Sequence, residues 1–250
     1  MRVEDIAAHE ARFDATGVNS NGIRHNMISK SIGIPGDGSM DYIDAGLASG
    51  DESYFYKTRF AKDQIVLHFT MGQLGGDMAT LARQNDHVSV PFVIGRNGTI
   101  YNLFPSFYWS YHLGPGAVGG NKERSRKTLG IELSNIGLLK PQGDELINDY
   151  GGVYCRISET AYYQRQSFRG YDYYATFTDA QYTALIVLLR YLTDRYNIAR
   201  NFLAEPDRYT AGSAIQDSGG IVSHANYRAT GKTDIGPAFD WQKVIGGVQA

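Results

Sequence analysis

The chain has 250 residues, a formal net charge of -2 and 42% hydrophobic residues, which is enough for one large domain, or one domain with an appendage, and a substantial core. This composition excludes a disordered chain and a collagen-like repeat. Because the charge is nearly balanced and no basic block occurs, we expect neither nucleic acid nor a membrane surface as a partner. No run of about 18 apolar residues occurs, so the sequence predicts no membrane span.

Residues 1–60 are rich in Gly, Ser, Asp and Asn, and the run 33–39 is typical of consecutive turns. We therefore predict a loosely structured N-terminal arm, which is a candidate docking segment for a partner or a delivery machinery. The first ten residues are charged from Arg2 onward and contain no apolar core. We expect no secretory signal and synthesis in the cytoplasm.

The remaining elements alternate between strands and helices. In chain order we predict a strand at 65–70, a helix from Asp77 to Asn85, a hairpin of 90–94 and 99–104, a strand at 128–134, a helix from Thr178 to Asn197 and a strand at 221–223. This order indicates an α/β fold with a mixed central β-sheet flanked by helices.

Three local signals support these elements. Asp77 is suited to cap the first helix. The dipeptide Asn97-Gly98 is a strong hairpin signal, because both turn positions need a positive φ. Thr178 and Gln181 form a capping box at the start of the last long helix.

A tyrosine-rich segment over about 140–177 has few aliphatic residues, which favours a large surface insertion over a core element. Its aromatic faces either stack on sugar rings as the wall of a groove or fold over the sheet as filler, and we favour the groove wall. The only cysteine, Cys155, lies in this segment and excludes a disulfide framework within the chain and a zinc site of several thiolates. A bound metal must therefore use histidines and carboxylates.

Three of the six histidines occupy positions that packing alone explains poorly: His68 lies within a buried strand, His112 follows an aromatic run, and His224 ends a strand. A lone buried histidine is more often a hydrogen-bonded core residue than a metal ligand. The segment 224–241 changes this expectation, because it also carries Asp234. Together with His68, these residues form a set of two histidines and one carboxylate, which is typical of catalytic zinc with an open fourth position.

Five motifs then occur in one order along the chain. They span 65–70, 88–101, 109–114, 129–133 and 223–241. With them the chain resembles the type 2 N-acetylmuramoyl-L-alanine amidases, a zinc family whose fold is shared with peptidoglycan recognition proteins. The resemblance covers roughly 62–139 and 178–245, and implies a zinc amidase domain over 61–250 with the tyrosine-rich insertion at about 140–177.

The resemblance also implies roles for individual residues. One catalytic Zn²⁺ is expected on His68, His224 and Asp234, where the last position is cysteine in many relatives. Glu132 matches the catalytic glutamate and Lys232 the catalytic lysine. Chemistry agrees with these roles, since Glu132 in apolar company has a raised pKa suited to proton transfer and Lys232 offers a cation to an oxyanion.

Substrate contacts are expected from His112, which matches a groove residue of the family, and from Trp109 and Asn135. Some relatives carry a catalytic tyrosine where this sequence has Val90, so we assign no tyrosine to catalysis. For His112, simple packing is the competing interpretation.

The resemblance implies a hydrolase that cleaves the amide bond between N-acetylmuramic acid and L-alanine, with peptidoglycan or muropeptides as its partner and a monomer as the default. Two alternatives are a non-catalytic peptidoglycan-binding module and a zinc peptidase that acts on the stem peptide. The lack of a signal fits a recycling enzyme, a phage endolysin or an injected effector.

Overall fold

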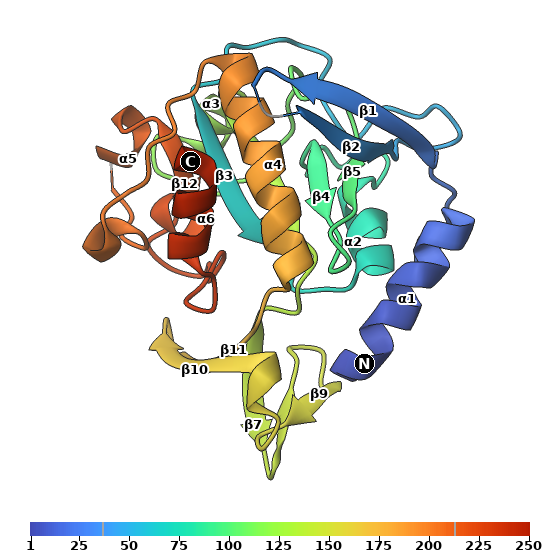
Figure 1. Ribbon diagram of the computed structural model, residues 1–250, viewed down its shortest axis with the longest axis vertical. Helices are drawn as coiled ribbons and strands as arrows, with labels where there is room; N and C mark the ends of the chain where they lie inside the picture. Colours follow the sequence, from blue (N-terminus) through green and yellow to red (C-terminus); the bar gives the residue numbers. More distant parts are fainter. Residues whose placement is uncertain (37, 213) are drawn as a thin grey trace.

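The computed structural model describes residues 1–36, 38–212 and 214–250, without the side chains of Gln216 and Asp217. Its centre is a seven-stranded sheet with the strand order β1-β2-β5-β4-β6-β3-β12 (Figure 1). The strands are β1 (Ile28–Ile34), β2 (Gly38–Asp44), β3 (Gln64–Phe69), β4 (Phe92–Ile94), β5 (Ile100–Asn102), β6 (Thr128–Leu133) and β12 (Gly220–Ser223). The sheet is mixed, because β12, β3, β6 and β4 are parallel whereas β4 pairs antiparallel with β5. This confirms the predicted fold class.

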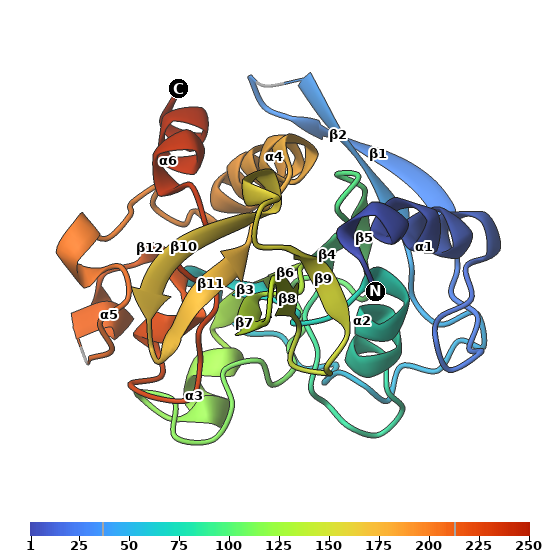
Figure 2. The same ribbon diagram turned by 90° about the horizontal axis from the view of Figure 1, so that it is seen from below.

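Helices cover both faces of this sheet. They are α1 (Val3–Thr16), α2 (Leu74–Leu81), α3 (Asn121–Ser125), α4 (Asp179–Tyr196), α5 (Ala214–Asp217) and α6 (Trp241–Gln249). Side chains alternate along a strand, so Phe92 and Ile94 belong to the core under α4, whereas Val93 between them packs in the cluster that contains α2. Figure 2 shows α4 and α2 on opposite sides of the sheet.

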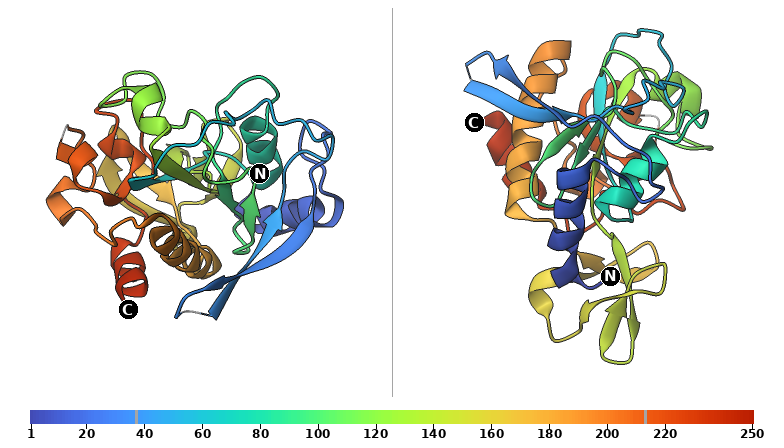
Figure 3. Two further views of the ribbon diagram at one scale, coloured as in Figure 1. Left: turned by 90° about the horizontal axis from the view of Figure 1, so that it is seen from above. Right: turned by 90° about the vertical axis from the view of Figure 1, so that its right-hand side faces the viewer.

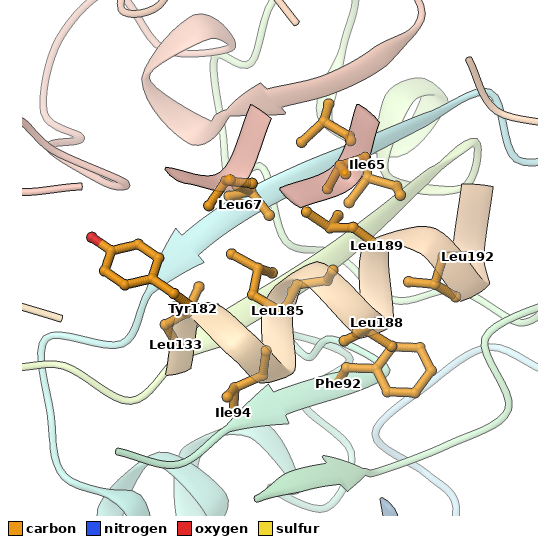
Figure 4. Packing of buried hydrophobic residues seen from close by; sticks show 14 of the residues in the cluster. Ile65, Leu67, Phe92, Ile94, Leu133, Tyr182, Leu185, Leu188, Leu189 and Leu192 are labelled. Atoms are coloured by element: carbon orange, nitrogen blue, oxygen red, sulfur yellow. The ribbon is translucent and has the colours of Figure 1, made fainter. Parts of the chain in front are cut away.

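Helix α4 supplies the centre of the larger core. Its residues Leu185, Leu188, Leu189 and Leu192 are fully buried, and Figure 4 shows them directed toward the strands. Burial of each leucine side chain stabilises the fold by about 1.5–3 kcal/mol. The predicted capping box is present, since the Thr178 side chain accepts a hydrogen bond from the Gln181 backbone N–H.

The prediction of a loosely structured arm over residues 1–60 is wrong for this part of the chain. Helix α1 buries Ile6 and Phe13, and β1 and β2 form an antiparallel hairpin that joins the central sheet through β5. Of the run predicted as turns, 33–39, residues 33–34 and 38–39 belong to these strands and residues 35–36 form a turn, whereas residue 37 lies outside the described residues. The physical reason is that Ile34 of β1 and Met40 of β2 insert into the main core.

The first predicted helix also differs from the structure. Helix α2 begins after Gln73 and ends at Leu81, so Asp77 lies inside it instead of capping it. The Asp77 carboxylate accepts a hydrogen bond of 2.6 Å from the Ser134 hydroxyl, which draws this side chain toward β6 and away from the end of the helix. The predicted hairpin is present as β4 and β5, but of its two turn residues only Gly98 has a positive φ.

The tyrosine-rich segment forms a second sheet of five antiparallel strands in the order β10-β11-β7-β8-β9. These strands are β7 (Leu138–Gln142), β8 (Glu145–Ile147), β9 (Val153–Arg156), β10 (Tyr163–Phe168) and β11 (Tyr171–Ala175). The sheet projects below the central one, beside the start of α1 (Figure 3). Tyr154, Tyr163 and Tyr173 pack with Ile6 in a small core of their own. These three tyrosines therefore stabilise the insertion and do not wall a groove.

Within the described ranges, no helix combines the length and apolar character that a membrane crossing requires.

Candidate active site

The parallel strands of the central sheet bring three of the predicted residues to one edge. His68 in β3 pairs in register with Glu132 in β6, and Ser223 at the end of β12 pairs with Leu67. His224 follows Ser223 directly. Because these strands are parallel, their carboxyl ends meet at the same edge, which is where open α/β sheets usually bind their ligands.

Three potential ligand atoms converge beyond this edge. His224 Nδ1 lies 2.7 Å from Asp234 Oδ2, and His68 Nδ1 lies 2.9 Å from His224 Nδ1 and 3.1 Å from Asp234 Oδ2. All three residues are buried, and the three atoms lie within 4.8 Å of one another. Two imidazole nitrogens and one carboxylate oxygen around one point fit a zinc ion that keeps a fourth position open.

The outer nitrogens of both imidazoles have their own partners. His224 Nε2 lies 2.9 Å from the Leu113 carbonyl, to which it donates a hydrogen bond. His68 Nε2 lies 3.0 Å from His112 Nδ1, and His112 Nε2 lies 2.8 Å from the Thr128 hydroxyl. In one consistent assignment of the protons, the Nε2 atoms of His224, His68 and His112 donate to Leu113, His112 and Thr128 in turn. The Nδ1 atoms of His68 and His224 are then unprotonated, and their lone pairs are available to a metal.

Electrostatics favour the same protonation states. Burial and the neighbouring His224 lower the pKa of His68 to about 4, so this imidazole is neutral at pH 7. Burial alone raises the pKa of Asp234, but the adjacent imidazoles of His224 and His68 hold it well below its usual value. The site therefore presents a neutral imidazole at His68 and an ionised carboxylate at Asp234, the forms in which these groups bind metals.

Glu132 lies beside the convergence point. Its Oε2 atom is buried and has no hydrogen-bond partner within the part of the chain that the structure describes. Burial raises the pKa of Glu132 well above its usual value, Asp234 raises it further, and Lys232 opposes the shift. A buried carboxylate oxygen without a partner is costly unless it has a function, so its presence here indicates a group that exchanges protons.

A cavity of about 150 Å³ joins these groups, and Lys232 also lines it. It adjoins a larger cavity of about 550 Å³, and both are lined by Thr70, Leu81, Val88 and Glu132. The larger cavity extends to His9 and Ser20 of the N-terminal segment and to Asn148 and Tyr150 of the insertion.

These outer lining residues were not found by sequence reasoning, except that Tyr150 belongs to the tyrosine-rich segment. Its side chain is 78% exposed, so it is available to a ligand in a way that the buried tyrosines are not.

Two predicted substrate contacts lie elsewhere. Trp109 is 5% exposed and stacks on Tyr56 at 4.3 Å between ring centroids. Asn135 is buried, donates to the Thr176 carbonyl at 3.0 Å and accepts from the Gly137 N–H at 2.7 Å. Neither side chain lines the cavity, because one is committed to an aromatic stack and the other to the backbone of the insertion.

His112 does line the cavity, but both its ring nitrogens are occupied by His68 and Thr128. Its predicted role in the substrate groove is therefore less compatible with the geometry than a role behind the first histidine. Hydrogen bonds from this loop residue to β3 and β6 produce the arrangement, and the local motif gives no sign of it.

The chain is similar to known proteins over most of its length. A family model described as N-acetylmuramoyl-L-alanine amidase matches residues 59–237. N-acetylmuramoyl-L-alanine amidase AmiD of Escherichia coli (strain K12) is 28% identical over 185 residues, which are 72% of this chain and 51% of that protein. The chain thus spans about half the length of this relative.

A solved structure of AmiD from E. coli, in complex with the substrate anhydro-N-acetylmuramic acid-L-Ala-D-gamma-Glu-L-Lys, has a similar fold. It superposes with a TM-score of 0.50 at 24% identity, over 76% of this chain and 59% of that one.

Proposed function

The chain belongs to the N-acetylmuramoyl-L-alanine amidase family, and from this premise we propose that it is a zinc-dependent hydrolase of peptidoglycan or its muropeptides. The bond cleaved is the amide between N-acetylmuramic acid and the L-alanine that begins the stem peptide. One observation carries this proposal: the three converging ligand atoms share a cavity with Glu132, whose buried Oε2 atom has no hydrogen-bond partner among the described residues.

His68, His224 and Asp234 would hold the metal. When bound, zinc polarises a carbonyl and lowers the pKa of water from 15.7 to about 7, which provides a nucleophile at neutral pH. The donor set supports zinc, because two imidazoles and a carboxylate suit this ion and one position stays open for water or substrate. His112 acts behind His68, where its hydrogen bond fixes the ring orientation and the tautomer.

Glu132 is the general base and then the general acid. Its ionised form takes a proton from the attacking water, and its raised pKa lets it pass this proton to the nitrogen of the departing L-alanine. The carbon–nitrogen bond then breaks, and the free amine and the lactyl carboxylate leave. Proton transfer by a positioned carboxyl group contributes about 10²–10⁴-fold to the rate.

Lys232 stabilises the negative charge that develops on the carbonyl oxygen. Lys232 lines the same cavity as Glu132 and Asp234, so the wall of this cavity carries a cation. A fixed cation in a cavity that excludes water stabilises an oxyanion more strongly than the same cation in solvent.

The test is digestion of purified peptidoglycan by the zinc-loaded protein, with and without a chelator, followed by mass spectrometry of the soluble products. We expect free stem peptides that begin with L-alanine, lost with the chelator and restored by zinc. Cleavage within the stem would indicate a peptidase instead. Stems that stay attached to glycan, with zinc confirmed in the protein, would contradict the proposal and indicate a binding module.

A further inference from the structure

We propose that Arg169, at the tip of the β10–β11 hairpin in the second sheet, is a positioning residue for Lys232. This inference rests on the proposed function, because it assigns to the insertion a task in the amidase reaction. The side chain of Arg169 crosses from the insertion to the loop between His224 and Asp234, which carries the catalytic lysine.

The guanidinium group binds three backbone carbonyls from separate points of the chain. It donates to the carbonyl of Lys232, to that of Ala225 at 3.1 Å and to that of Tyr209 at 3.2 Å. Ala225 directly follows a metal-ligand candidate, and Lys232 precedes another by two residues. Arg169 therefore joins the two ends of the loop to each other and to the neighbouring segment.

The hairpin aims the side chain at this loop. Arg169 itself has a positive φ of 49°, and Gly170 follows with a φ of 87°, so the chain reverses within these residues. Phe168 packs on Tyr209 at 5.0 Å between ring centroids, and the Arg169 guanidinium lies 5.2 Å from the Phe168 ring. The aromatic contact thus anchors the hairpin on the segment that Arg169 also binds.

The three residues whose carbonyls Arg169 binds differ in the other hydrogen bonds that hold them in place. Ala225 also donates its N–H to the Asp234 carbonyl at 2.9 Å. The Tyr209 hydroxyl donates to the Gly236 carbonyl at 2.7 Å and accepts from Trp241 at 2.9 Å. By contrast, Lys232 forms no other hydrogen bond among the described residues. Loss of Arg169 therefore frees Lys232 more than it frees either neighbour.

Arginine suits this task better than lysine does. Its planar group presents five N–H donors in a fixed fork, whereas an ammonium is a single point from which three separated carbonyls are hard to reach. Arg169 is half-buried, so its hydrogen bonds are partly shielded from competing water.

The experiment compares Arg169→Ala and Arg169→Lys with Arg165→Ala. Arg165 lies on the same hairpin, is exposed and contacts the Tyr173 ring at 5.6 Å, so it controls for loss of a cation from the insertion. We expect kcat to fall about 10- to 100-fold in both Arg169 variants, the cost of misplacing a catalytic group by about 1 Å. KM should stay within about twofold of the wild-type value, since Lys232 acts on the transition state.

Millimolar guanidinium should restore part of the lost kcat to Arg169→Ala, whereas ammonium at the same concentration should not. Unchanged kcat, a rise in KM alone, or equal losses in Arg165→Ala would overturn the proposal. If Arg169→Ala does not fold, the kcat of Arg169→Lys decides.

A second readout needs no amidase activity. Hydrogen exchange of the backbone amides over residues 228–233 should be faster in Arg169→Lys than in the wild type, and unchanged in Arg165→Ala. Unchanged exchange in this loop would overturn the positioning role even if the protein is an amidase. A wild-type protein that releases no stem peptide, yet shows the faster exchange in the variant, would overturn the proposed function and retain the structural link.

Discussion

The two sheets of this molecule contribute to the candidate site in different ways. The central sheet holds His68 and Glu132 within paired parallel strands, and places His224 directly after a third strand. The second sheet supplies none of the ligand or proton-transfer groups and buries its own tyrosines. It reaches the site through loops alone, by Arg169 and by the exposed Tyr150. His68, Glu132 and His224 thus lie in or directly after strands of the central sheet, whereas Asp234 and Lys232 lie on a loop that Arg169 of the insertion contacts.

The largest expected difference between the two sheets comes from removing one acidic residue from the site beside the central sheet and one from the second sheet. Asp234→Ala should lower zinc affinity and kcat by more than the roughly 100-fold loss that is typical of an outer partner of a metal ligand. Asp172→Ala, at an exposed position of strand β11, should leave both unchanged. Zinc titration and peptide release measure the two effects. Equal zinc affinity in Asp234→Ala and the wild type would exclude Asp234 as a ligand.

Glutamates offer a second matched pair. Glu132→Gln should reduce kcat by about 10²–10⁴-fold while zinc stays bound, because the amide cannot accept the proton of water. Glu145→Gln, on strand β8 of the second sheet, should have wild-type kcat. Stem-peptide release and metal content in the same samples provide the check. Loss of zinc together with activity would instead make Glu132 part of the metal site.

A smaller effect should follow from breaking the hydrogen-bond chain behind His68. His112→Ala should weaken zinc binding about 10- to 100-fold, because the first histidine loses the partner that fixes its tautomer. The pair Thr128→Val and Thr128→Ser refines the test, since only serine keeps the hydroxyl that His112 contacts. Equal zinc affinities in the two Thr128 variants would show that the Thr128 hydroxyl does not contribute to zinc binding and that the chain of hydrogen bonds behind His68 has no effect beyond His112.

The smallest effect concerns stability and not turnover. Burial raises the pKa of Asp77 to about 7, although hydrogen bonds from Ser134 and Thr70 oppose the shift. In the unfolded chain this pKa is about 4, so between about pH 4 and 7 the folded state keeps a proton that the unfolded state loses. The free energy of unfolding should therefore fall with rising pH, by at most about 1.4 kcal/mol per unit.

Asp77→Asn should remove this part of the slope, and the exposed Asp172→Asn should not. Urea unfolding at several pH values measures the slopes. An Asp77→Asn slope equal to that of the wild type would contradict the raised pKa.

Part of the site could be predicted from the sequence, because His68 and Glu132 lie on strands with continuous apolar runs. The runs around His68 and Glu132 predict buried strands, and a charged or polar residue inside such a run stands out. The capping box at Thr178 and Gln181 likewise predicts the start of α4 from local chemistry alone.

The rest depends on tertiary contacts that have no local signature. Strand β1 is exposed along most of its length, so no alternation of apolar residues reveals it, and its Gly33 resembles part of a turn. Asp77 has the residue type of a helix cap, but Ser134, far away in sequence, determines its position. Arg169 acts through backbone carbonyls, which are identical in every residue and leave no trace in the sequence.

The most direct test of the metal site is anomalous X-ray scattering at the zinc edge from crystals of the zinc-loaded protein. We predict one strong peak within bonding distance of His68 Nδ1, His224 Nδ1 and an oxygen of Asp234, with Glu132 beside it but not bound. A peak held by other residues, or none at these three atoms when zinc is present in the crystal, would contradict the assignment of these three residues as ligands.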